Sequence, residues 1–137
     1  MKKKLRGYIF SRPFFEERVP QHIQNLVLRN YCEKNNFFFL LSYTEYRMKN
    51  SSLMLNSILK NIKDIDGIVF YSLFQMPVDT SERQKIYSKI LKSKKELHFA
   101  VENIKANTIR EFNKIDNIYL IKKTIPNCIE NFQVKNK

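Results

Sequence analysis

Four short apolar runs, each separated from the next by a segment with helical spacing, constrain the fold of this chain more than any other feature. The runs lie within residues 5–10, 37–42, 67–72 and 96–101. Short apolar runs that alternate with amphipathic helices are typical of buried parallel strands joined by right-handed crossovers. The sequence therefore predicts an α/β fold, a three-layer sandwich with a mostly parallel sheet of four to five strands.

The segments between the runs carry apolar residues at spacings of three and four, which indicates helices that pack on the sheet. Asp79 and Glu82 have the spacing of a capping box, so they mark the start of one of them. The expected helices run from Gln21 to about Asn35, from Ser51 through Ile62 and from Asp79 through Leu91, and a weaker helix at 108–114 and a short strand at 118–121 follow.

The length of 137 residues suits one domain over residues 1–137, with a polar tail at 131–137 that is expected to fray. Hydrophobic content of 43% excludes a disordered chain. No apolar stretch approaches the roughly 20 residues of a membrane span, and no signal-peptide core follows the basic start, so we expect a cytoplasmic protein without a membrane partner. Cys32 and Cys128 have neither metal-site nor disulfide spacing, so no metal is expected.

The net charge of +12 raises the question of a nucleic-acid partner. The distribution of the basic residues weakens that case, however. Lys2, Lys3, Lys4 and Arg6 form one cluster, and the rest are dispersed apart from those from Lys85 to Lys95, which follow the polar side and end of a helix, where a solvated face is the usual explanation. The charge distribution therefore does not favour nucleic acid, and an anionic small molecule explains the excess equally well. The two glycines, Gly7 and Gly67, form neither GxGxxG nor GxxxxGK, so no cofactor is expected.

Polar residues follow each apolar run, where the carboxyl ends of parallel strands would bring them to one edge of the sheet. This edge is the predicted site. Its candidate binding residues are Ser11, Arg12, Arg18, Gln21, Thr44, Tyr46, Tyr71, Ser72, Gln75 and Arg83, and its candidate catalytic residues are Glu45, Glu102 and His98.

Two interpretations are open for the charged residues of this edge. Arg12 and Arg18 lie near a helix start and can bind a phosphate or carboxylate, or they can pair with Glu16 and Glu17 on a surface loop. Glu45 can act as an acid or base if an apolar pocket raises its pKa, or it can pair with the arginines.

The third and fourth strands add neutral and titratable groups. Ser72 and Gln75 can hydrogen-bond the hydroxyls of a substrate, and Arg83 can add charge. His98 and Glu102 are four residues apart and so point to one face of a strand, although a histidine in mid-strand is more often a hydrogen-bonded core residue than a catalyst.

Five ordered motifs resemble the sporadic carbohydrate cluster protein family, which is associated with bacterial surface-polysaccharide loci. They are Gly7–Phe14, Arg18–Gln21, Thr44–Tyr46, Tyr71–Pro77 and Leu97–Glu102. The resemblance covers the chain from about Gly7 to Cys128 and implies a pathway rather than a reaction.

A more distant resemblance concerns the fold. The order of Gly7-Tyr8, Ser11, the segment 21–26 and the apolar strand at 68–71 is similar to the catalytic domain of serine recombinases. The resemblance implies a resolvase-like or Rossmann-like sheet with a nucleophilic serine supported by arginines. Phe10 precedes Ser11, and the later segment carries Ser72 and Gln75 where arginines are expected, so DNA strand exchange is not predicted.

These observations lead to three hypotheses. The first is a cofactor-independent isomerase, epimerase or lyase that acts on a sugar, sugar phosphate or nucleotide sugar of a surface carbohydrate, with homo-oligomerisation left open. The second is a non-catalytic subunit that binds a sugar or a partner enzyme of that pathway. The third and least favoured is a recombinase-like nucleic-acid binder. Convergence of Glu45, Glu102 and Arg12 in one pocket would favour the first over the second.

Overall fold

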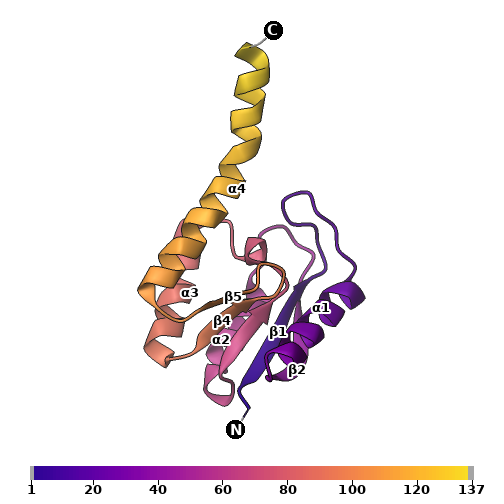
Figure 1. Ribbon diagram of the computed structural model, residues 1–137, viewed down its shortest axis with the longest axis vertical. Coiled ribbons are helices and arrows are strands. Elements are labelled where there is room, and N and C mark those ends of the chain that lie inside the picture. Colours follow the sequence, from indigo (N-terminus) through magenta and orange to yellow (C-terminus); the bar gives the residue numbers. More distant parts are fainter. Residues whose placement is uncertain (1, 136–137) are drawn as a thin grey trace.

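The computed structural model describes the backbone of residues 2–135 and the side chains of residues 2–124. A five-stranded sheet lies between helix α1 on one face and helices α2, α3 and α4 on the other (Figure 1), which confirms the predicted α/β sandwich. The strands are β1 (Lys4–Phe10), β2 (Phe38–Glu45), β3 (Gly67–Phe70), β4 (Glu96–Phe99) and β5 (Ile104–Ala106); the helices are α1 (Gln21–Lys34), α2 (Leu53–Lys60), α3 (Thr80–Ser93) and α4 (Ile109–Lys135), with 3₁₀ turns η1 (Ile62–Asp64) and η2 (Leu73–Gln75).

The strand order is β2-β1-β3-β4-β5. Strands β1 to β4 are parallel, and β5 runs antiparallel to β4. The carboxyl ends of the four parallel strands therefore meet at one edge, as predicted. None of the helices in the described part of the chain is both long and apolar enough to span a bilayer.

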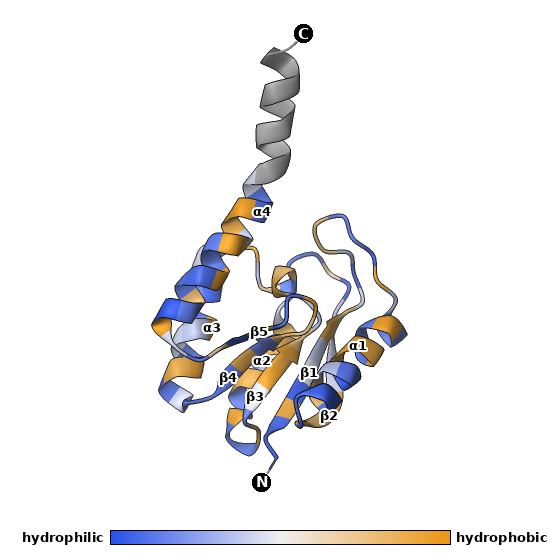
Figure 2. Ribbon diagram, viewed as in Figure 1, coloured by the Kyte–Doolittle hydropathy of each residue, from blue (hydrophilic) through white to orange (hydrophobic). Residues whose placement is uncertain are grey.

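Alternation along β1 divides the core into two layers. Leu5 and Ile9 pack toward α1, whereas Tyr8 and Phe10 pack toward the other three helices. This two-sided burial explains why β3, in the centre of the sheet, is apolar throughout, and Figure 2 shows β3 as a largely hydrophobic strand.

The segment after β4 differs from its prediction. Residues 118–121 belong to α4 rather than to a strand, because Phe112, Ile115 and Tyr119 are all buried at the three- and four-residue spacing of a helix face. The fifth strand is β5, whose three residues are too few to show a period. Of the tail expected to fray, the backbone through Lys135 is part of α4, and residues 136–137 lie outside the described residues.

Candidate functional site

Glu45 ends β2 and anchors the start of α2. Its carboxylate is 1% exposed and accepts hydrogen bonds from the Tyr8 hydroxyl (2.9 Å), the Ser51 hydroxyl (2.8 Å) and the backbone N–H groups of Met54 and Leu55 (3.2 Å each). Burial alone would raise the pKa of Glu45, but these hydrogen bonds hold it below its ordinary value. Glu45 is therefore ionised at neutral pH, and its partners are neutral groups rather than the predicted arginines.

Ser11 and Arg12 join the end of β1 to the segment after β2. The Ser11 hydroxyl donates to the Glu45 carbonyl oxygen at 2.8 Å. The Arg12 guanidinium donates to the carbonyl oxygens of Tyr46 and Ser51 at 2.9 Å each and lies 4.2 Å from the centre of the Phe10 ring. Arg12 thus uses both of its terminal nitrogens to donate to backbone carbonyl oxygens.

Gln24 is a central residue of this edge that the sequence did not single out. It is 1% exposed, and its amide pairs with the Phe10 backbone in both directions, accepting from N–H at 3.0 Å and donating to C=O at 2.9 Å. Gln75 donates to its oxygen at 2.8 Å. Gln21, the residue of this helix that was predicted from the sequence as a binding residue, is exposed. The spacing of Gln24 from the buried Leu28 and Tyr31 was the signal that could have identified it.

Glu102 and Ser72 organise the turn after β3. The Ser72 hydroxyl and the Leu73 N–H donate to the Glu102 carboxylate at 2.8 and 2.9 Å. Ser72 also accepts from the Phe74 N–H, and Gln75 completes a capping box on η2. Like Glu45, Glu102 therefore accepts a hydrogen bond from a backbone N–H group, and the hydrogen bonds of the two carboxylates share no residue.

Arg83 is fully buried at the interface between α3 and α4. Its Nε donates to Asp116 at 2.7 Å, its Nη1 donates to the Pro77 and Val78 carbonyl oxygens at 3.0 and 2.8 Å, and its Nη2 donates to the Thr80 hydroxyl at 3.1 Å. Of the remaining candidates, Thr44 is half-buried in β2, Tyr71 is half-buried beside Phe14, and Arg18 and Tyr46 are exposed.

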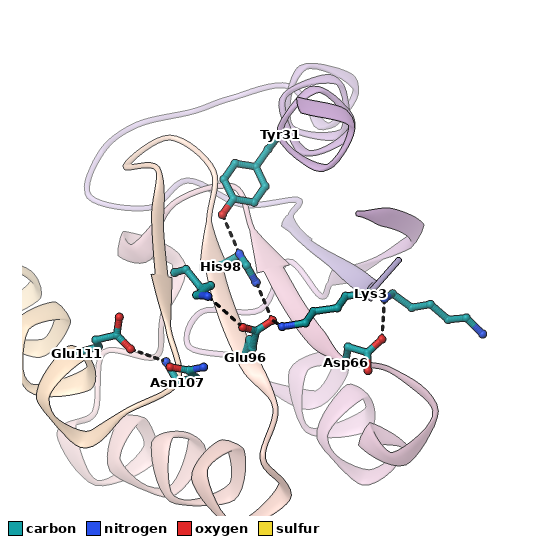
Figure 3. A network of polar contacts seen from close by, with 9 residues as sticks. Lys3, Tyr31, Asp66, Glu96, His98, Asn107 and Glu111 are labelled. Carbon is teal, nitrogen blue, oxygen red and sulfur yellow. Dashed lines mark hydrogen bonds and ion pairs between the residues drawn. The ribbon is translucent and has the colours of Figure 1, made fainter. Parts of the chain in front are cut away.

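His98 lies away from this edge, in the middle of β4 and beneath α1 (Figure 3). Its Nδ1 is 2.7 Å from the Tyr31 hydroxyl, and its Nε2 is 3.6 Å from Glu96 Oε1. Burial lowers the pKa of His98 to about 4, against the opposing charge of Glu96. His98 is therefore a neutral core residue at pH 7, with Lys3 and Lys105 on the outer side of Glu96.

A cavity of about 570 Å³ opens beside the carboxyl edge, between the β1–α1 loop, the segment before α2, the η2–α3 loop and α4. Arg12 lines it, but Glu45 and Glu102 do not. The three residues thus do not converge in this cavity. Among the described residues, no three His, Cys, Asp or Glu side chains come together to hold a metal ion.

The sheet order and helix placement define a resolvase-like fold, the fold of serine recombinase catalytic domains. The crystal structure of the N-terminal catalytic domain of TP901-1 integrase matches with a TM-score of 0.60 and 16% identity, over 96% of this chain and 98% of that chain. A resolvase family site-specific recombinase from Streptococcus pneumoniae matches with a TM-score of 0.60 and 10% identity, over 94% of this chain and 99% of that chain. No protein-family model and no curated protein sequence matches the chain.

These comparisons correct the leading hypothesis. The resemblance to sporadic carbohydrate cluster proteins finds no support, and a surface-carbohydrate enzyme with a sugar partner was the wrong expectation, because the similar structures are recombinases. The sequence was also wrong to rank nucleic acid last among partners. The structure offers a physical reason, since the polar residues at the strand ends that suggested a sugar site mostly hold backbone.

Proposed function

We propose that this protein binds DNA electrostatically and does not exchange DNA strands. The main support is the charge of the chain, which has 25 lysines and arginines and 13 acidic residues. Among the described side chains, three of the basic residues form ion pairs, namely Lys3 and Lys105 with Glu96 and Arg83 with Asp116. Most of the positive charge is thus available to a polyanion, and lysines that neutralise phosphates release counterions.

The proposed phosphate contacts lie in a groove between α2 and α3. Lys60 and Lys89 line it together with neutral residues, its volume is about 480 Å³, and no carboxylate is part of its lining. Lys85 and Lys92 are exposed four and three residues from Lys89, hence on the same side of α3. This groove supports phosphate contacts from both helices.

The groups around Ser11 support binding without strand exchange. A serine nucleophile needs a base to take its proton and cations to stabilise the transition state. The Ser11 hydroxyl instead donates to a backbone carbonyl, and the adjacent Arg12 is held by carbonyl oxygens. The resemblance to recombinases accordingly supports a binding surface rather than their chemistry.

The test is a salt titration of duplex binding followed by fluorescence anisotropy. Each lost phosphate contact reduces the slope of log K against log salt by about 0.9. The double variant Lys60→Gln/Lys89→Gln is expected to reduce the slope by about 1.8 and to weaken binding equally for unrelated duplex sequences.

The matched control is Lys2→Gln/Lys34→Gln, which removes the same charge from exposed positions near β2 and at the end of α1. It is expected to leave the slope nearly unchanged. Absence of duplex binding by the unmodified protein at 50 mM salt would refute the function. Equal effects of the two double variants would refute the placement on α2 and α3.

A further inference from the structure

The cavity beside the carboxyl edge combines aromatic walls with basic side chains. Phe14, Phe15, Phe74 and Tyr119 line it, together with the basic side chains of Arg12, Lys49 and Lys123 and the carboxylates of Asp79 and Glu82. Its volume of about 570 Å³ lies within the range of small-molecule sites. Ser52 lines this cavity, and the next residue, Leu53, lines the groove between α2 and α3. The two hollows are therefore neighbours on the surface.

A strained turn places Phe15 at the cavity. Phe14 and Glu17 pair through two backbone hydrogen bonds of 3.0 and 2.9 Å, and the two residues between them have positive φ, 49° at Phe15 and 65° at Glu16. Such turns favour Asn-Gly, and a bulky residue in this region is strained. Strain of this kind clusters at functional sites. Here it sets the Phe15 ring 5.5 Å from Phe74 and 5.4 Å from Tyr119, centre to centre.

Tyr119 contributes a polar group without a partner. The residue is 0% exposed, the Arg83 guanidinium lies 4.2 Å from the centre of its ring, and its hydroxyl has no partner at hydrogen-bond distance among the described residues. A buried unpaired hydroxyl costs about 1–3 kcal/mol. A ligand with a hydrogen-bonding edge would remove that cost.

We propose that the cavity binds one unpaired nucleobase, which stacks against Phe15 and Phe74 and meets the Tyr119 hydroxyl with its edge, while Lys49 and Lys123 contact the attached phosphate. A nucleotide combines the π-face and hydrogen-bonding edge of its base with a phosphate, and each feature has a counterpart here. The inference rests on the proposed DNA binding where the base belongs to a bound strand. A free nucleotide carries the same chemistry and is the other source.

The experiment titrates the protein with a single-stranded oligonucleotide that contains 2-aminopurine, with its fully paired duplex, and with the free 2-aminopurine nucleotide. Phe15→Asn and Phe15→Ala both remove the ring, and asparagine tolerates positive φ. Both variants are expected to weaken binding of the oligonucleotide about five- to hundredfold and to leave duplex binding unchanged. Phe15→Asn is expected to be the more stable variant in urea, so a loss of binding that it shares with Phe15→Ala is not a loss of folding.

Tyr119→Phe deletes only the unpaired hydroxyl and is expected to weaken the same binding about fivefold. The free nucleotide identifies the source: affinity equal to that of the oligonucleotide, lost in Phe15→Asn, supports a free nucleotide in the same cavity. If the unmodified protein binds strands with the expected salt dependence but Phe15→Asn does not alter 2-aminopurine affinity, the pocket is refuted and DNA binding stands. If no strand binds at any salt, DNA binding fails and the free nucleotide alone decides the pocket.

Discussion

Lowering the pH from 7 to 5 is expected to destabilise this protein through one side chain, His98. The imidazole is fully buried, and the ionisable groups that surround it are the Tyr31 hydroxyl from α1, Glu96 on its own strand, Lys105 on β5 and Lys3 before β1. Glu96 favours the protonated imidazole, whereas burial and the two lysines disfavour it. Burial prevails, and the pKa of His98 falls to about 4.

The sign and size of the effect follow from linkage. An unfolded histidine has a pKa of about 6.5, so between pH 6.5 and 4 the unfolded chain binds a proton that the folded chain refuses. Stability therefore falls as the pH falls through this window. The fall in the pKa of His98 from about 6.5 to about 4 corresponds to roughly 3 kcal/mol in full, of which about 2 kcal/mol is lost between pH 7 and 5. Total stabilities of 5–15 kcal/mol are typical, so the loss is readily measured.

The assay is urea denaturation at several pH values, followed by circular dichroism. The window from pH 7 to 5 lies above the ordinary pKa of carboxylates, so Glu45 and Glu96, whose pKa values are lowered, contribute little to the change. His98→Gln cannot titrate and is expected to give a flat profile over the same window. A flat profile in the unmodified protein, or an equal decline in His98→Gln, would refute the reasoning.

Two further substitutions test the polar contacts inside the fold by urea denaturation at pH 7. Gln24→Ala is expected to lower the free energy of unfolding by about 2–3 kcal/mol, because it leaves buried backbone groups of Phe10 unpaired. The control, Gln21→Ala on the exposed side of the same helix, is expected to change it by less than about 0.5 kcal/mol. Similar losses of stability for both variants would contradict the role assigned to Gln24. Arg83→Met is expected to lower the free energy of unfolding by about 3–5 kcal/mol, because it leaves Asp116 buried without its ion-pair partner. Adding Asp116→Leu is expected to restore part of this loss. A double variant that is less stable than Arg83→Met would argue against this pairing.

The pattern of apolar runs was sufficient to predict the sheet. Burial on both faces makes β3 a continuous apolar run, the other parallel strands include apolar residues among polar ones, and the intervening helices show their own period. The prediction of a strand from Ile118 to Ile121 was wrong because four residues are too few to distinguish a strand from a turn of helix. Only its register with Phe112 and Ile115 reveals one long helix face.

Position along the chain was enough to place the polar side chains at the carboxyl edge of the sheet, but it could not supply the partners of those side chains. Gln75 meets Gln24 across 51 residues of sequence, and Ser72 meets Glu102 across 30. Such pairs depend on how the strands are ordered in the sheet, which periodicity does not encode. The position of Glu45 at a strand end therefore suggested an acid or base, whereas in the folded protein its carboxylate accepts hydrogen bonds from backbone N–H groups.

The same distinction separates this chain's fold from recombinase chemistry. Function resides in the groups at a site rather than in the fold that carries them. At the carboxyl edge, Ser11, Arg12 and Glu45 donate to or accept from backbone, so the fold is stabilised by the residues that could have reacted. Among the described residues, the lysines of the α2–α3 groove make no ion pair, and together with the neighbouring aromatic cavity they carry the proposed contacts to a nucleic-acid strand.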